Sequence, residues 1–282
     1  MAFNKDLLKK FLERRIDEGW HNNFGNSPAG ILYNEIIMSY ILSFLPPEDS
    51  LTLDVGIDSG IFSEKIARLN RRVIIGSISE EQMKFTREHF EKLNLTAQID
   101  QYALIDEITK LDQFDHNTFD LTICIHGTLS FACEYRNRLF SEIIRVTKVG
   151  APIIFTVKNK THFLKSLYQK NNIDNLVNAT EAGIWEFLDT NYKQFEEYPN
   201  EPAYYAFTSM ELDEFVSKHN CELLEMRALN SISQANSKFL LEIQENEEAW
   251  SNLLQIEKRI SNEPGVIDAG NEILFIIRKR LV

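Results

Sequence analysis

Apolar side chains recur along this chain in two patterns, one at helical spacing and one in short continuous runs. Residues 5–18 and 31–45 have the helical spacing, and Pro46 and Pro47 end the second stretch because proline cannot continue a helix. From residue 51 onward, short apolar runs alternate with helical stretches, which predicts βαβ units and parallel strands with right-handed crossovers. The expected strands are residues 51–55, 73–78, 97–103, 119–125, 152–157, 222–229 and 272–278, and the expected later helices are 62–70, 79–93, 136–147, 208–219 and 237–262.

The alternation is interrupted by residues 159–207, which are polar and rich in aromatic side chains. We interpret this stretch as an insertion over the sheet and not as a separate domain. The alternation resumes after it, and no internal repeat is apparent. A chain of 282 residues with this pattern is expected to fold around one α/β sheet, with a helical leader in front of it.

The net charge and the number of cysteines indicate which kinds of partner the chain can have. Thirty basic against 42 acidic side chains give a net charge of −12, so sequence-independent binding to nucleic acid is not expected. The first residues are too charged for a signal peptide, and no apolar run is long enough to span a bilayer, so we expect no membrane association. Three cysteines without metal-ligand spacing indicate reduced thiols and no metal site. We predict a soluble, acidic, cytoplasmic protein, and an oligomer stays open.

The segment from Leu51 to Arg68, LTLDVGIDSGIFSEKIAR, has the pattern strand, tight turn, helix. Gly56 and Gly60 mark the turn. Glycines let the backbone come close to a ligand, and the free N–H groups of the helix start point at it. This pattern predicts a nucleotide-type ligand at the carboxyl end of the first strand. The spacing G-x-G-x-G is broken by Asp58.

Several segments resemble, in order, the motifs of class I S-adenosylmethionine (SAM) dependent methyltransferases. LDVGIDSGIFSEKIA is similar to the first motif of that family, LDxGxGTGxxS, and ISEEQMKFTREHF is similar to the segment after its second strand. NTFDLTICIHGTLSF resembles the fourth-strand motif, and EIIRVTKVGAPIIFTV resembles the segment before the fifth strand. FTSMELDEFV and EILFIIRKR fit the last helix and the last strand. The likeness covers roughly residues 50–158 and 205–280.

The resemblance implies an α/β fold with a doubly wound, mostly parallel seven-stranded sheet. Residues 1–50 would then form an N-terminal helical lid, and residues 51–158 the cofactor-binding half of the α/β domain. Residues 159–207 would be a helical, aromatic insertion after the fifth strand, lying over the active site. Residues 208–282 would complete the same α/β domain.

The resemblance also implies SAM as the cofactor. Carried over by position, Gly56 and Gly60 would shape the turn and Asp54 would brace it. The full set of cofactor contacts that the resemblance implies is Asp54, Gly56, Asp58, Gly60, Ser77, Ile78, Asp106, Glu107 and Ile125.

Two of these positions depart from the pattern of the family. Asp58 stands where a glycine would pass against the methionine part of SAM, so it would meet the SAM ammonium, collide with its carboxylate, or serve only as a turn residue that caps the next helix. Ser77 stands where an acid would hold both ribose hydroxyls, and losing that acid would weaken binding about tenfold to a hundredfold or more. The alternative for Ser77 is a small strand-end residue without ligand contact. Asp106 or Glu107 would reach the adenine amino group, and a solvated loop acid is the interpretation we favour for both.

Methyl transfer needs a positioned acceptor and, for some acceptors, a base. His126 is the best-placed candidate because it directly follows the fourth strand, and open α/β sheets bind ligands at that edge. An imidazole with a pKa of about 6.5 can take a proton at neutral pH. The alternative is a loop histidine bonded to backbone. His21 and Tyr33 of the leader are further candidates that would close over the site, and their alternatives are a surface loop and a helix core face.

Three hypotheses remain. The first is a SAM-dependent methyltransferase of a small molecule, with His126 as candidate base. The second is a protein of the same fold that no longer methylates, such as a cyclase in a biosynthetic pathway, and the third is a silent partner subunit. Asp58 and Ser77 favour the second and third. We predict the first, because a decayed pocket would usually lose its turn glycines as well.

Overall fold

A seven-stranded sheet with the order β3-β2-β1-β4-β5-β9-β8 forms the centre of the molecule. The computed structural model describes residues 3–17, 25–57, 60–105, 107, 109–169, 177, 180, 183–193, 201–233 and 237–281. The first five strands pair in parallel, and β9 runs antiparallel between β5 and β8. The strands are β1 (Leu51–Val55), β2 (Arg72–Ser77), β3 (Ile99–Leu104), β4 (Leu121–Cys124), β5 (Pro152–Lys158), β8 (Cys221–Leu229) and β9 (Glu272–Lys279).

Every expected strand of this sheet is present, with bounds close to those predicted, so the predicted fold class is confirmed. The stretch expected as a helix over residues 237–262 is divided in two, because the Asn246 side chain caps a new helix start by accepting from the Ala249 N–H. The helices are α1 (Lys5–Asp17), α3 (Pro28–Ser43), α4 (Ile61–Arg68), α5 (Glu80–Lys92), α6 (Thr128–Phe131), α7 (Arg136–Val146), α8 (Lys160–Gln169), α10 (Ile184–Thr190), α11 (Ser209–Ser217), α12 (Ser237–Gln244) and α13 (Glu247–Ile260), with the 3₁₀ turns η1 (Thr96–Gln98), η2 (Cys133–Tyr135) and η4 (Ile267–Ala269).

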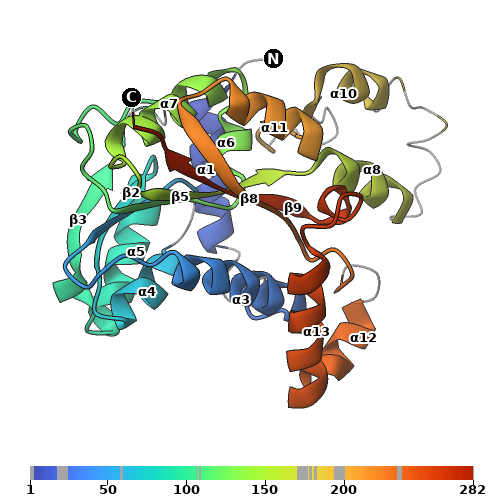
Figure 1. Ribbon diagram of the computed structural model, residues 1–282, viewed down its shortest axis with the longest axis horizontal. Helices are drawn as coiled ribbons and strands as arrows, with labels where there is room; N and C mark the ends of the chain where they lie inside the picture. Colours follow the sequence, from blue (N-terminus) through green and yellow to red (C-terminus); the bar gives the residue numbers. More distant parts are fainter. Residues whose placement is uncertain are drawn as a thin grey trace.

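The two faces of the sheet are covered by different helices, because successive strand residues point to opposite sides. Ile153 and Phe155 of β5 belong to a core that includes α1, α7 and α11, whereas Ile154 belongs to a core that includes α3 and α4. Figure 1 shows these two helical layers on either side of the sheet. Both layers are apolar where they meet the strands, so each face of the sheet is buried.

Helix α1 packs against segments that follow two different strands. Its Leu8 and Leu12 are buried in the core with α7 and α11. Its Phe11 ring lies 5.9 Å from Phe131 of α6, which follows β4. The helix also contacts α5, which follows β2. The carboxyl ends of β2 and β4 lie at one edge of the sheet, so α1 lies along that edge.

The insertion after β5 packs back onto the main domain. Its described parts are α8, α10 and a short hairpin of β6 (Tyr192–Lys193) and β7 (Tyr204–Tyr205). The Arg136 guanidinium of α7 lies 3.7 Å from the ring centroid of Tyr205 and donates to the Tyr192 hydroxyl at 2.9 Å. Phe163 and Phe187 pack edge to face inside the insertion. Aromatic side chains therefore anchor this segment.

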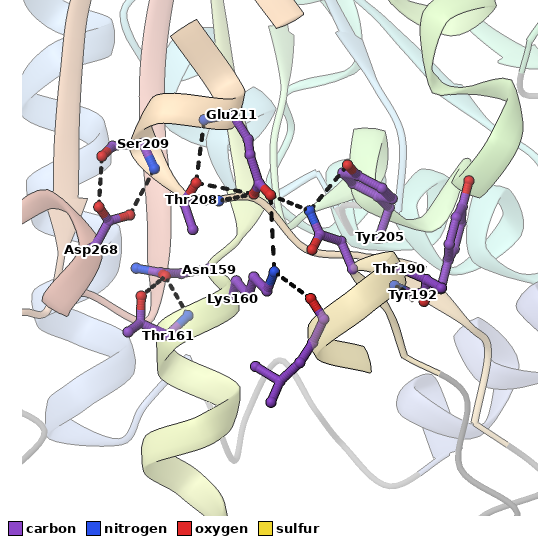
Figure 2. Close-up of polar contacts among 12 residues, drawn as sticks. Asn159, Lys160, Thr161, Thr190, Tyr192, Tyr205, Thr208, Ser209, Glu211 and Asp268 are labelled. Atoms are coloured by element: carbon purple, nitrogen blue, oxygen red, sulfur yellow. Dashed lines mark hydrogen bonds and ion pairs between the residues drawn. The ribbon is translucent and has the colours of Figure 1, made fainter. Parts of the chain in front are cut away.

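A polar network fastens the same segment to α11 and η4 (Figure 2). Glu211 accepts from the Thr208 backbone N–H and from the Asn191 side chain, and Lys160 lies 3.9 Å from it. Ser209 donates to Asp268 through its backbone N–H at 2.7 Å and its hydroxyl at 2.6 Å. These bonds join the beginning and the end of the insertion, so its place on the sheet is held from both sides.

One further carboxylate holds the turn after β8. Glu257 of α13 is 1% exposed. It accepts from the backbone N–H groups of Ser231, Ile232 and Ser233 and from the Ser231 hydroxyl, at 2.8–3.0 Å. The bonds offset the cost of burying this carboxylate and fix the turn to α13. Among the residues that the structure describes, no helix has the length and apolar character needed to cross a bilayer.

Candidate functional site

The turn between β1 and α4 is pressed against the segment that follows β4. Gly56 has φ +143°, and a Cβ atom placed there would lie 2.2 Å from the Thr128 hydroxyl oxygen. That hydroxyl accepts from the Ile57 N–H at 3.1 Å and donates to the Ile125 carbonyl at 2.7 Å. Thr128 thus clamps the two turns together, and only glycine fits at residue 56.

Gly60 closes the same turn and begins α4. Its φ is +85°, and a Cβ there would approach Thr86 of α5 to 3.0 Å. As the N-cap of α4, Gly60 makes no side-chain capping bond. The first N–H groups of a helix need partners from outside the helix, and an anionic or polar ligand can supply them. Below the turn, the Ser63 hydroxyl donates to the buried Asp54 carboxylate, which ties α4 to β1.

At the end of β2, the Ser77 side chain is hydrogen-bonded to the Gln82 side chain. Ser77 is 3% exposed, its hydroxyl donates to the Gln82 carbonyl oxygen at 2.6 Å, and it accepts from the Ser79 N–H at 3.2 Å. The Gln82 amide reaches on to the Ile57 carbonyl at 3.4 Å. Ser79 caps α5 by accepting from the Gln82 N–H. The Gln82 side chain, however, points to Ser77 and the glycine turn and makes no return bond to the Ser79 N–H, which Ser77 already satisfies.

His126 follows β4 in a left-handed conformation with φ +58°, which histidine adopts more readily than most residues. Its ring stacks on Tyr33 of α3, with centroids 5.5 Å apart and an interplanar angle of 21°. On another side it meets Phe62 of α4 at 5.8 Å. The structure therefore brings together two of the predicted catalytic residues, His126 and Tyr33, next to the helix that follows the glycine turn.

A buried carboxylate completes this group. Glu272, the first residue of β9, is 6% exposed. It accepts from the Tyr33 hydroxyl at 2.8 Å and from the Lys158 ammonium at 2.5 Å. Burial by itself would raise the pKa of Glu272, but the charges of Lys158 and His126 and the hydrogen bonds from Lys158 and Thr156 outweigh it and lower that pKa to about 2. The carboxylate is charged at any physiological pH.

Comparison with known proteins identifies the domain. Residues 53–155 match the family model of a methyltransferase domain. The chain is 24% identical over 184 residues to the ubiquinone biosynthesis O-methyltransferase of Coxiella burnetii, which covers 65% of this chain and 74% of that protein. Residues 53–155 thus carry a methyltransferase domain, and the chain is similar to class I SAM-dependent methyltransferases.

Solved structures agree with the fold of this methyltransferase domain. A SAM-dependent methyltransferase from Methanosarcina mazei is similar with a TM-score of 0.54 and 19% identity, covering 86% of this chain and 98% of that one. The cyclase SpnF is similar with a TM-score of 0.54 and 13% identity, covering 87% and 80%. Structural likeness at such identities concerns the fold alone, so the chemistry has to be argued from the site.

The methyltransferase domain is a fit for SAM at the glycine turn and departs from the family at the ribose end. Gly56 and Gly60 form the turn, and Gly60 as the N-cap of α4 supplies no side-chain cap. At Ser77 there is no carboxylate, and its hydroxyl is already bonded to Gln82. Neighbouring Ile78 is buried at 2% exposure.

The remaining predicted cofactor and catalytic positions differ in their surroundings. Ile125 is fully buried, and its carbonyl accepts from Thr128. Glu107 is half exposed and forms an ion pair with Lys110 at 2.7 Å, which matches a solvated loop acid. Its pKa is lowered by the hydrogen bond from Lys110. His21, Asp58 and Asp106 lie outside the described residues.

Sequence reasoning missed four residues of this region: Thr128, Gln82, Lys158 and Glu272. The segment HGTLS contained a signal for Thr128, a hydroxyl two residues after the candidate base. A signal for Glu272 was the acid in front of the apolar run ILFII. Among the described residues, no group of three or more histidine, cysteine, aspartate or glutamate side chains is arranged to hold a metal ion.

Proposed function

We propose that this protein transfers the methyl group of SAM to a hydroxyl oxygen of a small-molecule acceptor, with His126 as the general base. The observation that carries the proposal is the place of His126. It follows β4 at the ligand-binding edge of the sheet, between Phe62 of α4 and Tyr33 of α3, with Glu272 nearby.

Bound SAM would supply the methyl group: the acceptor oxygen would form the new O–CH₃ bond as the S–CH₃ bond breaks, and the electron pair would stay on sulfur to give S-adenosylhomocysteine. The acceptor proton moves to an imidazole nitrogen of His126 and later to solvent. A positioned base of this kind contributes typically about a hundredfold to ten-thousandfold to the rate.

The chemistry of the base favours a phenol as acceptor. A phenolic hydroxyl has a pKa of about 10 and imidazole a pKa of about 6.5, a gap that concerted proton transfer can bridge, whereas an aliphatic alcohol is far less acidic. The similarity to an O-methyltransferase of ubiquinone biosynthesis supports a hydroxyl acceptor. Helix α1 and the insertion after β5 would cover this acceptor, and the contacts of α1 with α5 and α6 support that arrangement.

Two measurements test the proposal. Isothermal titration with SAM and S-adenosylhomocysteine is expected to give micromolar binding, and no binding up to millimolar concentration would refute it. A panel of phenols, assayed by formation of S-adenosylhomocysteine, then identifies an acceptor. On that acceptor, His126→Asn is expected to lower kcat about a hundredfold or more and to leave SAM binding unchanged. The matched control is His116→Asn, because His116 is exposed in the loop before β4. Equal rates of the two variants would exclude His126 as the base.

A second function is supported by Ser77. An enzyme of this fold that does not methylate would not need a carboxylate for the SAM ribose, and Ser77 bonded to Gln82 presents none. In that case neither SAM nor S-adenosylhomocysteine binds, and a silent partner subunit would give the same result in this titration.

A further inference from the structure

Glu272 is a buried charge that contacts the proposed base through Tyr33, and the expected roles of the fold do not account for it. A carboxylate at 6% exposure is costly unless it is paired and hydrogen-bonded. Its partners come from two separate elements: Tyr33 on α3, and Lys158 and Thr156 on β5. Together they keep the buried carboxylate in its charged form.

The two oxygens of this carboxylate have different partners. One accepts from the Lys158 ammonium, and the other accepts from the Tyr33 hydroxyl. The Tyr33 ring in turn stacks on the His126 imidazole at 5.5 Å. The bond to Glu272 therefore fixes the orientation of the ring that supports His126.

The charge of Glu272 also acts on His126 directly. Protonated His126 stabilises the Glu272 carboxylate, and an electrostatic interaction between two groups is reciprocal, so the carboxylate stabilises the imidazolium equally. Lys158 opposes this effect, and its side chain is 30% exposed, so part of its charge is screened by water. Among the described residues, three titratable groups interact with Glu272 through a contact or through charge: Lys158, Tyr33 and His126.

We propose that Glu272 is a positioning residue for the methyl-transfer site: it holds Tyr33 against His126 and stabilises the imidazolium that forms when His126 takes the acceptor proton. The inference rests on the proposed function. Gly127 and Thr156 support the arrangement, since the Gly127 N–H donates to the Thr156 hydroxyl at 3.1 Å and fixes the turn that carries His126.

The test is a titration of the His126 imidazole by NMR, which needs neither SAM nor an acceptor. The chain has six histidines, and the resonance that is missing in His126→Asn belongs to His126. The titration midpoint is the pH at which that resonance has shifted halfway between its two limits. In Glu272→Gln this midpoint is expected to move to lower pH, and in Glu272→Asp it is expected to return toward the wild-type value. An unchanged midpoint in Glu272→Gln would overturn the inference.

Two variants separate this role from loss of structure. Glu257→Gln changes another buried carboxylate, held by the turn after β8, and is expected to leave the His126 midpoint unchanged. If Glu272→Gln does not fold, the double variant Glu272→Gln with Lys158→Met leaves neither charge of the ion pair buried alone. Its midpoint is expected below that of Lys158→Met, and equal midpoints would refute the inference. The proposed function fails on a different result, the absence of SAM and S-adenosylhomocysteine binding.

Discussion

Replacing Thr128 by valine tests whether the clamp between the glycine turn and the segment after β4 supports the cofactor site. Valine has nearly the same shape but no hydroxyl. The buried Ile57 N–H would lose its acceptor, and the buried Ile125 carbonyl would keep only the Thr128 backbone N–H, at 3.3 Å. An unsatisfied buried group costs about 1–3 kcal/mol and a lost hydrogen bond about 1 kcal/mol, so the expected loss in free energy of unfolding is about 2–4 kcal/mol. A typical domain has only about 5–15 kcal/mol in total.

Thr128→Ser is the matched control because it keeps the hydroxyl and removes one buried methyl group, at a cost of about 1 kcal/mol. The assay is urea unfolding followed by circular dichroism, together with calorimetric titration of S-adenosylhomocysteine. We expect Thr128→Val to unfold at clearly lower urea than Thr128→Ser and to bind the nucleoside more weakly, because the turn is less fixed. If both variants unfold at the same urea concentration and bind equally, the clamp contributes nothing and the reasoning is wrong.

Three further predictions concern other carboxylates and their replacements. Ser77→Asp is expected to strengthen SAM binding about tenfold or more, since a carboxylate accepts two charge-assisted hydrogen bonds from a ribose, and calorimetry showing equal or weaker binding would count against a ribose site at β2. Glu257→Gln is expected to lower the free energy of unfolding by about 2 kcal/mol or more, because one of the two oxygens becomes a donor among buried donors, and an unchanged urea midpoint would contradict this. Because the pKa of Glu272 is lowered from 4.5 to about 2 in the folded protein, its stabilising effect is complete above about pH 4.5 and is lost as the pH falls toward 2, so the difference in melting temperature between wild type and Glu272→Gln should shrink below pH 4.5. A difference that stays constant down to pH 3 would show that the carboxylate is not stabilised by folding.

The fold could be predicted from the sequence because its strands are marked by local patterns. Runs such as FDLTICI and EILFIIR are mostly apolar, as expected of strands buried on both faces, and Pro46 stands just past the end of α3. The order of the motifs then indicated a doubly wound, mostly parallel seven-stranded sheet. The glycine turn was predicted from its spacing for the same reason, since the positive φ values at Gly56 and Gly60 are a local requirement.

The polar partners of the site could not be predicted, because they depend on contacts between distant segments. Glu272 and Lys158 are 114 residues apart, and only the antiparallel pairing of β5 with β9 makes them neighbours. Gln82 shows the limit of a local motif. A serine followed three residues later by a glutamine has the spacing of a mutual cap, yet Ser77 satisfies the Ser79 N–H, and the Gln82 side chain bonds to residues on β2 and the glycine turn.

Because β9 lies between β5 and β8, the sheet and the group around His126 depend on the same late event in folding. In chain order β8, α12 and α13 come before β9, and the sheet is complete only when β9 pairs with both β5 and β8. During synthesis, the glycine turn can be assembled from β1, β2 and β4 long before Glu272 has left the ribosome. A nascent or truncated chain that stops before β9 can thus be compact and still lack the carboxylate beside His126, and it would expose the edges of β5 and β8 to association with other chains. The pairing of β9 therefore brings Glu272 to His126 and covers the open strand edges in a single step.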